Sequence, residues 1–187
     1  MVDCLFEKVN EVEKHMEIIN GVEVIQDKAT SSHNNAVMEI ASALKGHISS
    51  RGIQCKVFTQ NVALFVNEIC GNNDLFLPDV MVVCDEDICE DGIHIAPLFI
   101  AEVTSESSRI NDYGYKREVY RSIGVTEYWI VDIQRNLIEK HLLSKGYISD
   151  CYFHPEAMKV TTLNMVTDVS DFMDEHQYKS FCSVKDP

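Results

Sequence analysis

Two carboxylates interrupt apolar stretches of the sequence, and this makes them the residues best placed to do chemistry. Asp79 follows Pro78 and precedes the apolar run of residues 80–84. Glu102 lies within a second apolar run, residues 98–103. An ionised carboxylate in such surroundings is unfavourable unless a salt bridge, a proton or a metal ion compensates its charge.

The spacing of the two runs predicts that these acids meet. If the runs pair as an antiparallel hairpin through residues 85–97, the start of the first strand lies beside the end of the second. Asp79 and Glu102 then face each other, and two close carboxylates repel unless a proton or a divalent cation lies between them. Ligation by oxygen without sulfur suits Mg²⁺ or Mn²⁺. The sequence therefore indicates a metal site at this end of the sheet.

The segment after Glu102 is expected to bring positive charge to the acids. Asp112, Lys116 and Tyr120 are spaced four residues apart and share one face of a helix. Residues 109–121 contain four basic and two acidic residues, a local reversal in an acidic chain. Lys116 could reach back to Glu102 and orient a water molecule or neutralise a phosphate. We interpret Asp112 as an ion-pair partner of Lys116, and Tyr120 as a core residue.

The N-terminal part of the chain supplies a hairpin and a helix. Asn20-Gly21 between two short apolar runs predicts a hairpin over residues 17–25. Residues 30–32 offer an N-cap for the helix that follows, which Arg51-Gly52 ends. His33 lies at the start of the apolar face of this helix. That face comprises Val37, Ile40, Ala41, Leu44 and Ile48.

The remaining pattern indicates one α/β (α+β mixed) domain with a mixed sheet over residues 1–187. A helix is predicted over residues 108–123, ending at Gly124, and it is long enough to link two parallel strands. Residues 85–95 read as an acidic, solvated loop, and residues 168–187 as an acidic tail. Strands are predicted over residues 57–66, 80–84, 98–103, 128–131, 137–143 and 147–153.

The order of these motifs resembles the PD-(D/E)XK nuclease superfamily and, within it, the Uma-two family of restriction-endonuclease-like proteins. The resemblance covers about residues 15–145. It is carried by His33-Asn34, Pro78-Asp79-Val80, Ala96-Pro97, Glu102-Val103-Thr104, then Asp112, Lys116 and Tyr120, and finally Gly124-Val125-Thr126-Glu127-Tyr128-Trp129-Ile130-Val131-Asp132.

The resemblance implies a restriction-endonuclease-like core, a mixed central β-sheet flanked by helices. It implies that Asp79, Glu102 and the backbone carbonyl of Val103 bind the metal. The lysine that the superfamily places two residues after the Glu is Thr104 here, and Lys116 from the next helix matches the lysine of the family. His33 matches the position in the first helix that completes the site, as an auxiliary ligand or phosphate contact.

These residues favour an Mg²⁺-dependent endonuclease that hydrolyses DNA phosphodiester bonds, with Asp79, Glu102, Lys116 and His33 as its catalytic residues. The alternative is a non-catalytic binding or assembly protein that keeps the nuclease fold. A weaker third possibility is a metal-dependent hydrolase of another phosphate ester.

The charge of the chain limits its partners. The 30 acidic and 16 basic residues give a formal net charge of −14, which argues against general coating of nucleic acid. Any DNA binding is therefore expected to be weak, local, metal-assisted and sensitive to salt. Cleavage of both strands of a duplex favours a homodimer with two sites.

Other bulk features suggest a cytoplasmic protein. Seven scattered cysteines without a CxxC pair predict a reduced, intracellular chain without a disulfide framework. Cys84 and Cys89 are the closest pair, and two cysteines are poor evidence for zinc. The sequence contains no apolar run near the ~18 residues of a membrane span, and its charged N-terminus lacks the apolar segment of a signal peptide.

Overall fold

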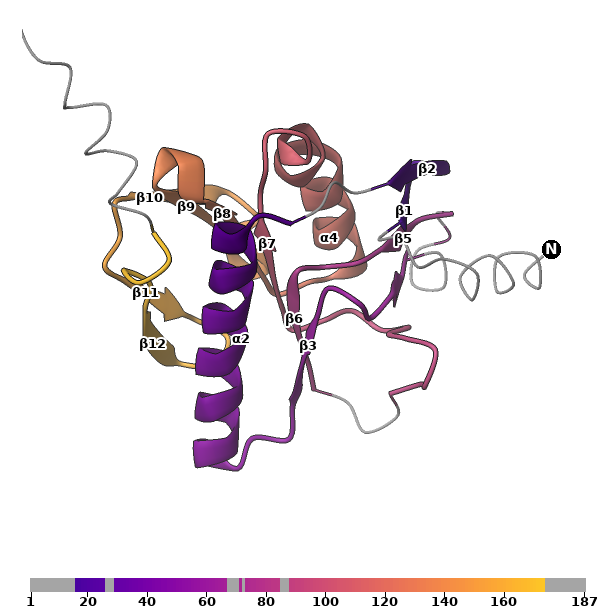
Figure 1. Cartoon of the computed structure of the whole chain (residues 1–187). Coiled ribbons are helices and arrows are strands. Elements are labelled where there is room, and N and C mark those ends of the chain that lie inside the picture. Colours follow the sequence, from indigo (N-terminus) through magenta and orange to yellow (C-terminus); the bar gives the residue numbers. More distant parts are fainter. Residues whose placement is uncertain (1–15, 26–28, 67–70, 72, 85–87, 174–187) are drawn as a thin grey trace, which may run out of the picture.

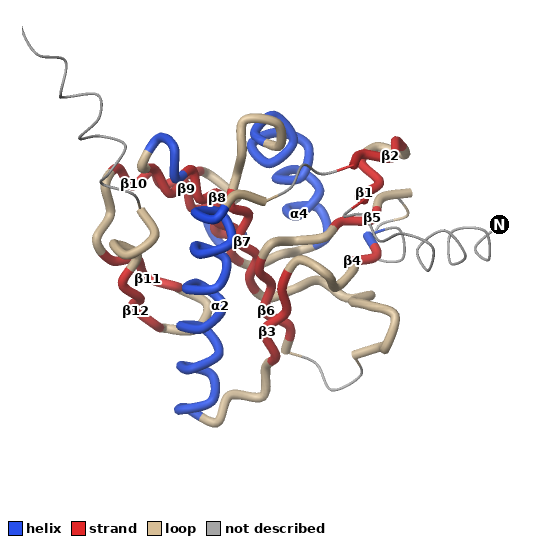
Figure 2. Tube along the Cα trace, viewed as in Figure 1, coloured by secondary structure: helices blue, strands red, loops and turns tan. Residues whose placement is uncertain are grey.

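The two apolar runs form adjacent interior strands, β6 and β7, of a six-stranded mixed sheet in the order β10-β9-β8-β7-β6-β3 (Figures 1 and 2). The computed structural model describes residues 16–25, 29–66, 71, 73–84 and 88–173. Strands β6 and β7 pair antiparallel, and β7 pairs parallel with β8, as a mixed sheet requires. The strands are β3 Lys56–Thr59, β6 Val80–Val83, β7 Phe99–Val103, β8 Glu127–Asp132, β9 Leu137–Leu142 and β10 Ser149–Phe153.

The link between the parallel strands β7 and β8 is the predicted helix. It contains a π-helical turn, Asn111–Lys116 (η1), followed by α4, Arg117–Ile123. Gly124 ends it with φ 93°, a left-handed conformation that glycine adopts without steric cost. π-Helical turns occur often at functional sites, and this one carries both Asp112 and Lys116.

Helices cover both faces of the six-stranded sheet. Helix α2, Ser31–Arg51, begins where the Thr30 side chain accepts a hydrogen bond from the His33 backbone N–H. Its buried side chains pack against Val80, Val82, Ala101 and the other residues of one face, whereas α4 packs against the alternate residues. The buried residues of α2 are Ala36, Val37, Ile40, Leu44 and Ile48, close to the predicted apolar face.

A second sheet, in the order β2-β1-β5-β4, lies on the α4 side of the core. The predicted hairpin is present as β1, Met16–Ile19, and β2, Val22–Ile25. Asn20 and Gly21 both have positive φ, as a tight two-residue hairpin turn requires. Ile18 pairs with Leu75, which places β1 beside β5, Leu75–Phe76, and β5 in turn pairs with β4, Leu64–Phe65.

One sequence prediction about a strand and one about the acidic tail are corrected. Residues 57–66 do not form one strand, because the chain turns after Thr59 and its two halves, β3 and β4, enter different sheets. A further hairpin, β11 Ala157–Val160 and β12 Met165–Asp168, precedes the predicted tail. Val169, Phe172 and Met173 are buried in the core, so the tail cannot begin at 168; residues 174–187 lie outside the described residues.

The cysteine prediction is also corrected. Cys55 and Cys84 form a disulfide beside the paired residues Lys56 and Val83, where the antiparallel register of β3 and β6 brings them together. Sequence spacing could not indicate this pair because 29 residues separate the two cysteines. None of the helices that the structure describes has the length and apolar character of a membrane span.

Candidate active site

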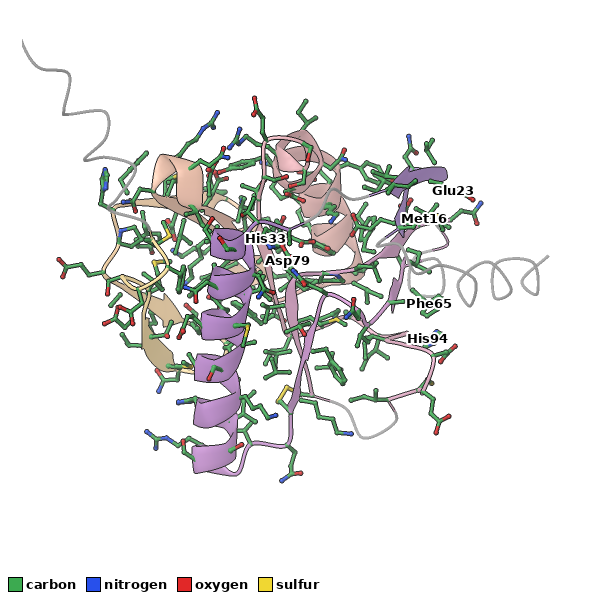
Figure 3. The ribbon with its side chains drawn as sticks, viewed as in Figure 1. Met16, Glu23, His33, Phe65, Asp79 and His94 are labelled. Carbon is green, nitrogen blue, oxygen red and sulfur yellow. A yellow bond between two sulfur atoms is a disulfide. The ribbon has the colours of Figure 1, made fainter. Side chains whose placement is uncertain are left out.

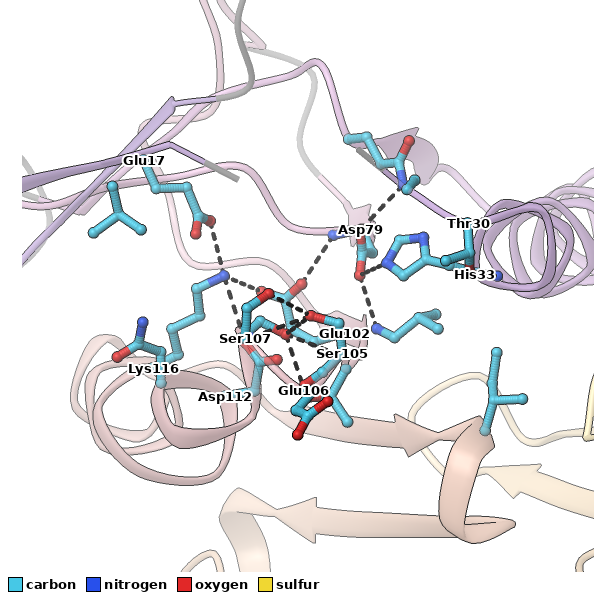
Figure 4. A pocket seen from close by; sticks show the side chains of 18 of the residues that line it. Glu17, Thr30, His33, Asp79, Glu102, Ser105, Glu106, Ser107, Asp112 and Lys116 are labelled. Carbon is cyan, nitrogen blue, oxygen red and sulfur yellow. Dashed lines mark hydrogen bonds and ion pairs between the residues drawn. The ribbon is translucent and has the colours of Figure 1, made fainter. Parts of the chain in front are cut away.

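Asp79 and Glu102 lie beside each other at one end of the β6–β7 pair (Figure 4). The register that pairs Val80 with Ala101 continues to these two residues. The backbone N–H of Asp79 donates to Oε2 of Glu102 at 3.1 Å, and that of Val103 donates to Oδ2 of Asp79 at 2.8 Å. Each acid is thus fixed by the backbone of the opposite strand, and both side chains are buried.

Lys116 extends from η1 into the same cluster, as Figure 4 shows. Its Nζ lies 3.1 Å from Oε1 of Glu102, 2.8 Å from Oε1 of Glu17 and 3.7 Å from Oδ1 of Asp112. Burial lowers the pKa of Lys116, but the three carboxylates outweigh it and hold the pKa well above its ordinary value. Lys116 therefore carries a buried positive charge.

Glu102 is the most perturbed acid of the cluster. Burial raises its pKa to about 8, Lys116 opposes this shift, and the charges of Asp79, Asp112 and Glu17 add to it. The hydroxyl of Tyr120 donates to Oε1 of Glu102 at 2.7 Å, so this core tyrosine also contacts the site. Burial likewise raises the pKa of Asp112. The cluster holds more negative charge than Lys116 neutralises, so a further cation or a proton would stabilise it.

His33 approaches Asp79 from the first turn of α2, on the opposite face of the sheet from α4. Its Nε2 lies 3.2 Å from Oδ2 of Asp79. Burial lowers the pKa of His33. The hydrogen bond to Asp79, the negative charge of Asp79 and a hydrogen bond with the Val103 backbone outweigh burial and raise the pKa of His33 above its ordinary value. Nδ1 of His33 is buried and has no hydrogen-bond partner among the described residues.

These side chains line a cleft of about 690 Å³. Its acidic lining residues are Glu17, Asp79, Glu102, Glu106 and Asp112, against Lys116 and His33.

The basic residues of 109–121 do not supply the expected patch beside the site. Only Lys116 among them lines the cleft. Arg109 pairs with the buried carboxylate of Asp132 at 3.1 Å. Arg117 and Arg121 both pair with Glu118 at the surface. The predicted local excess of positive charge is therefore largely neutralised within the fold.

Glu17 is the site residue that the sequence did not indicate. It lies in β1, is 1% exposed, and its Oε1 accepts a hydrogen bond from the backbone N–H of Leu77 as well as contacting Lys116. The signal in the sequence is an acid just before the apolar pair Ile18-Ile19, within the predicted hairpin. Thr104 stands two residues after Glu102, where the superfamily has its lysine. Thr104 is buried, and its Oγ1 lies 3.3 Å from Oγ of Ser108.

Comparisons with known proteins concern the family and the fold of the chain. A family model named Uma2 and described as "Putative restriction endonuclease" matches residues 5–166. A crystal structure described as a "putative nuclease belonging to DUF820" from Anabaena variabilis ATCC 29413 superposes with a TM-score of 0.74. The two are 15% identical, and the match covers 90% of this chain and 94% of that one, so it shows a shared fold. No curated protein matches the chain.

Proposed function

The chain belongs to the Uma2 family, and from this premise we propose that it is an Mg²⁺- or Mn²⁺-dependent endonuclease that hydrolyses DNA phosphodiester bonds. The observation that carries the proposal is the convergence of Asp79, Glu102 and Lys116 at the end of two paired strands. Family and fold support a nuclease, and this cluster supports the metal and the reaction class.

The residues of the cluster fit a hard divalent cation. Asp79, Glu102 and the backbone carbonyl of Val103 would hold it through oxygen atoms alone, the donors that Mg²⁺ and Mn²⁺ prefer. The raised pKa of Glu102 reflects its burial and, beyond that, the charges of Asp79, Asp112 and Glu17; a cation would stabilise the ionised carboxylate in place of a proton. Nδ1 of His33 is buried and has no partner among the described residues, so it would form a hydrogen bond with a bound water or phosphate.

When bound, such a cation would lower the pKa of a water molecule and polarise a phosphoryl oxygen. Lys116 would hold its charge close to the scissile phosphate and neutralise the negative charge that develops during hydrolysis. Glu17 and Asp112 would keep the Lys116 ammonium in position, and Tyr120 would fix one oxygen of Glu102. His33 would hold Asp79 from the opposite side and contact the phosphate.

The acidic cleft predicts how DNA would bind. Five acids and one lysine line it, so phosphate affinity depends on the added cation. We therefore propose weak, local binding that weakens further with salt, and a homodimer whose two sites cut the two strands. Light scattering on the protein, alone and with a DNA duplex, tests the dimer.

The endonuclease proposal is tested by nicking of supercoiled plasmid in Mg²⁺ or Mn²⁺. We expect wild type and the surface control Glu39→Gln to nick equally, and Glu102→Gln and Asp79→Asn to lose activity. Glu39 is exposed on α2, outside the cleft, so its variant controls for the loss of one negative charge. Absence of nicking by wild type, or equal nicking by Glu102→Gln, contradicts the proposal.

A non-catalytic binding or assembly protein is the second candidate, and the burial of Lys116 among three carboxylates favours it. With Lys116 and a proton to balance the charge of its acids, the cluster needs no metal to be stable. Titration calorimetry with Mn²⁺ on wild type and Asp79→Ala separates the two functions. The endonuclease requires a metal site in wild type that Asp79→Ala removes, whereas the binding or assembly protein requires no metal site at Asp79.

A further inference from the structure

A second group of ligating side chains lies on the turn formed by residues 89–94, between β6 and β7. The thiol of Cys89, the carboxylate of Asp91 and the imidazole of His94 place their ligand atoms within 4.8 Å of one another. None of the three lines the acidic cleft. Figure 3 labels His94 next to Phe65 and apart from His33 and Asp79, so this group is separate from the candidate active site.

The backbone of the 89–94 turn is held firmly against the core. The backbone N–H of Ile93 donates to the carbonyl of Ala63, and that of Phe65 donates to the carbonyl of Ile93, both at 2.8 Å. The Ile93 side chain is 1% exposed. These contacts fix the segment that carries Asp91 and His94, so the ligands do not have to be gathered from a mobile loop.

Gly92 lets the turn close. It has φ 150°, and a Cβ atom there would lie 2.6 Å from the carbonyl oxygen of Ala63 and 2.7 Å from the Phe65 ring. Glycine is therefore required for this close approach. Cys89 pairs with Gly92 in an antiparallel bridge, which brings the thiol back toward the other two side chains.

The imidazole of His94 is oriented on two sides. Its ring stacks on Phe65 with centroids 4.5 Å apart and an interplanar angle of 3°. Its Nε2 lies 3.2 Å from Oδ1 of Asp91. Stacking restrains the ring, and the carboxylate holds Nε2 of His94 close to the carboxylate oxygen of Asp91.

We propose that Cys89, Asp91 and His94 bind one Zn²⁺ ion. A thiolate, an imidazole and a carboxylate together favour Zn²⁺ over Mg²⁺, which prefers oxygen donors alone. Three protein ligands leave one tetrahedral position for water on the exposed side of the turn. Binding requires loss of the Cys89 thiol proton, which passes to solvent. Cysteine spacing alone could not indicate this site, because two of its three ligands are not cysteines.

Co²⁺ titration of the full chain tests the site, because cobalt bound by a thiolate gives a strong near-ultraviolet charge-transfer band. We expect wild type to develop this band up to one ion per chain, and one equivalent of Zn²⁺ to abolish it. Cys89→Ser and His94→Gln should lack the band. Cys151→Ser, which removes another exposed thiol, should retain it.

Asp79→Ala should also retain the band, which separates this site from the proposed Mg²⁺ site and from the fate of the endonuclease proposal. Circular dichroism on each variant verifies folding. A band that is absent from wild type, or that persists in Cys89→Ser, overturns the zinc site.

Discussion

Lys116 lies closer to Glu17 than to Glu102: its Nζ is 2.8 Å from Oε1 of the former and 3.1 Å from Oε1 of the latter. Glu17 belongs to the N-terminal hairpin, whereas Glu102 lies in the central sheet. The ammonium therefore joins the two sheets at the site. The position of the hairpin consequently determines where the charge of Lys116 lies relative to Asp79.

Replacement of Glu17 should weaken activity by displacing Lys116. Glu17→Gln removes the charge and keeps the shape, so we expect plasmid nicking to fall about tenfold, less than the ~100-fold expected when a directly acting group is lost. The KM for DNA should change little, because Glu17 would act through Lys116. The measurement is the steady-state nicking rate over a range of DNA concentrations, which gives kcat and KM, with the exposed Glu23→Gln of the adjacent strand as control. An equal loss in both variants would contradict a positioning role.

Removal of the buried cation should affect both activity and stability. Lys116→Met retains much of the side-chain volume but leaves Glu17, Glu102 and Asp112 without their cation. We expect nicking to fall about 100-fold or more. We also expect the free energy of unfolding to fall by about 3–5 kcal/mol at neutral pH.

Urea denaturation measures the stability part of this prediction, and the exposed Lys159→Met is the matched control. The deficit of Lys116→Met should shrink in acid, where the stranded carboxylates take up protons. A deficit that is independent of pH would show that lost packing, rather than lost charge, destabilises the variant.

Much of the central sheet could be predicted because its signals are local. Residues 80–84 and 98–103 are continuous apolar runs, which is typical of strands covered on both faces. Their antiparallel pairing then places Asp79 beside Glu102. The break between β3 and β4 falls at Gln60-Asn61, a polar pair within a largely apolar stretch. One polar pair does not by itself distinguish a turn from a polar interruption within a single strand.

The rest of the site depends on contacts between distant segments. Glu17 joins it only because Ile18 pairs with Leu75, a contact that no local pattern specifies. The sequence predicts Arg109 near Asp79 and Glu102, but Arg109 instead forms an ion pair with the buried Asp132 of β8. The charge of the 109–121 segment could be counted from sequence, whereas its partners could be known only from the packed structure.

The Cys55–Cys84 disulfide can be tested by counting thiols. Denatured protein that was never reduced should react with two fewer equivalents of a thiol reagent than reduced protein, because the disulfide-bonded sulfurs of Cys55 and Cys84 do not react with the reagent. The double variant Cys55→Ser/Cys84→Ser should lose this difference and about 3.6 kcal/mol of stability, the value expected for a disulfide between cysteines 29 residues apart. Cys151→Ser should keep the difference. Equal thiol counts before and after reduction would mean a reduced pair.

The pKa of Glu102 predicts how the stability of the metal-free protein depends on pH. Its folded value of about 8 lies above the ordinary value of 4.5, so the folded state holds a proton that the unfolded state releases between these pH values. The free energy of unfolding should therefore lose a contribution as pH rises through this window, by at most about 1.4 kcal/mol per pH unit for one proton.

Glu102→Gln mimics the protonated side chain and should lack this dependence. Urea denaturation in EDTA should show the variant gaining stability relative to wild type as pH rises from about 5 to 8. Glu102→Gln also loses the ion pair with Lys116. This loss changes the stability of the variant by the same amount at every pH in the window, because the pKa of Lys116 lies well above this range. It therefore does not alter how the stability difference between variant and wild type depends on pH. Parallel stability curves for the two proteins across the window would mean that Glu102 is ionised throughout, with Lys116 compensating its burial.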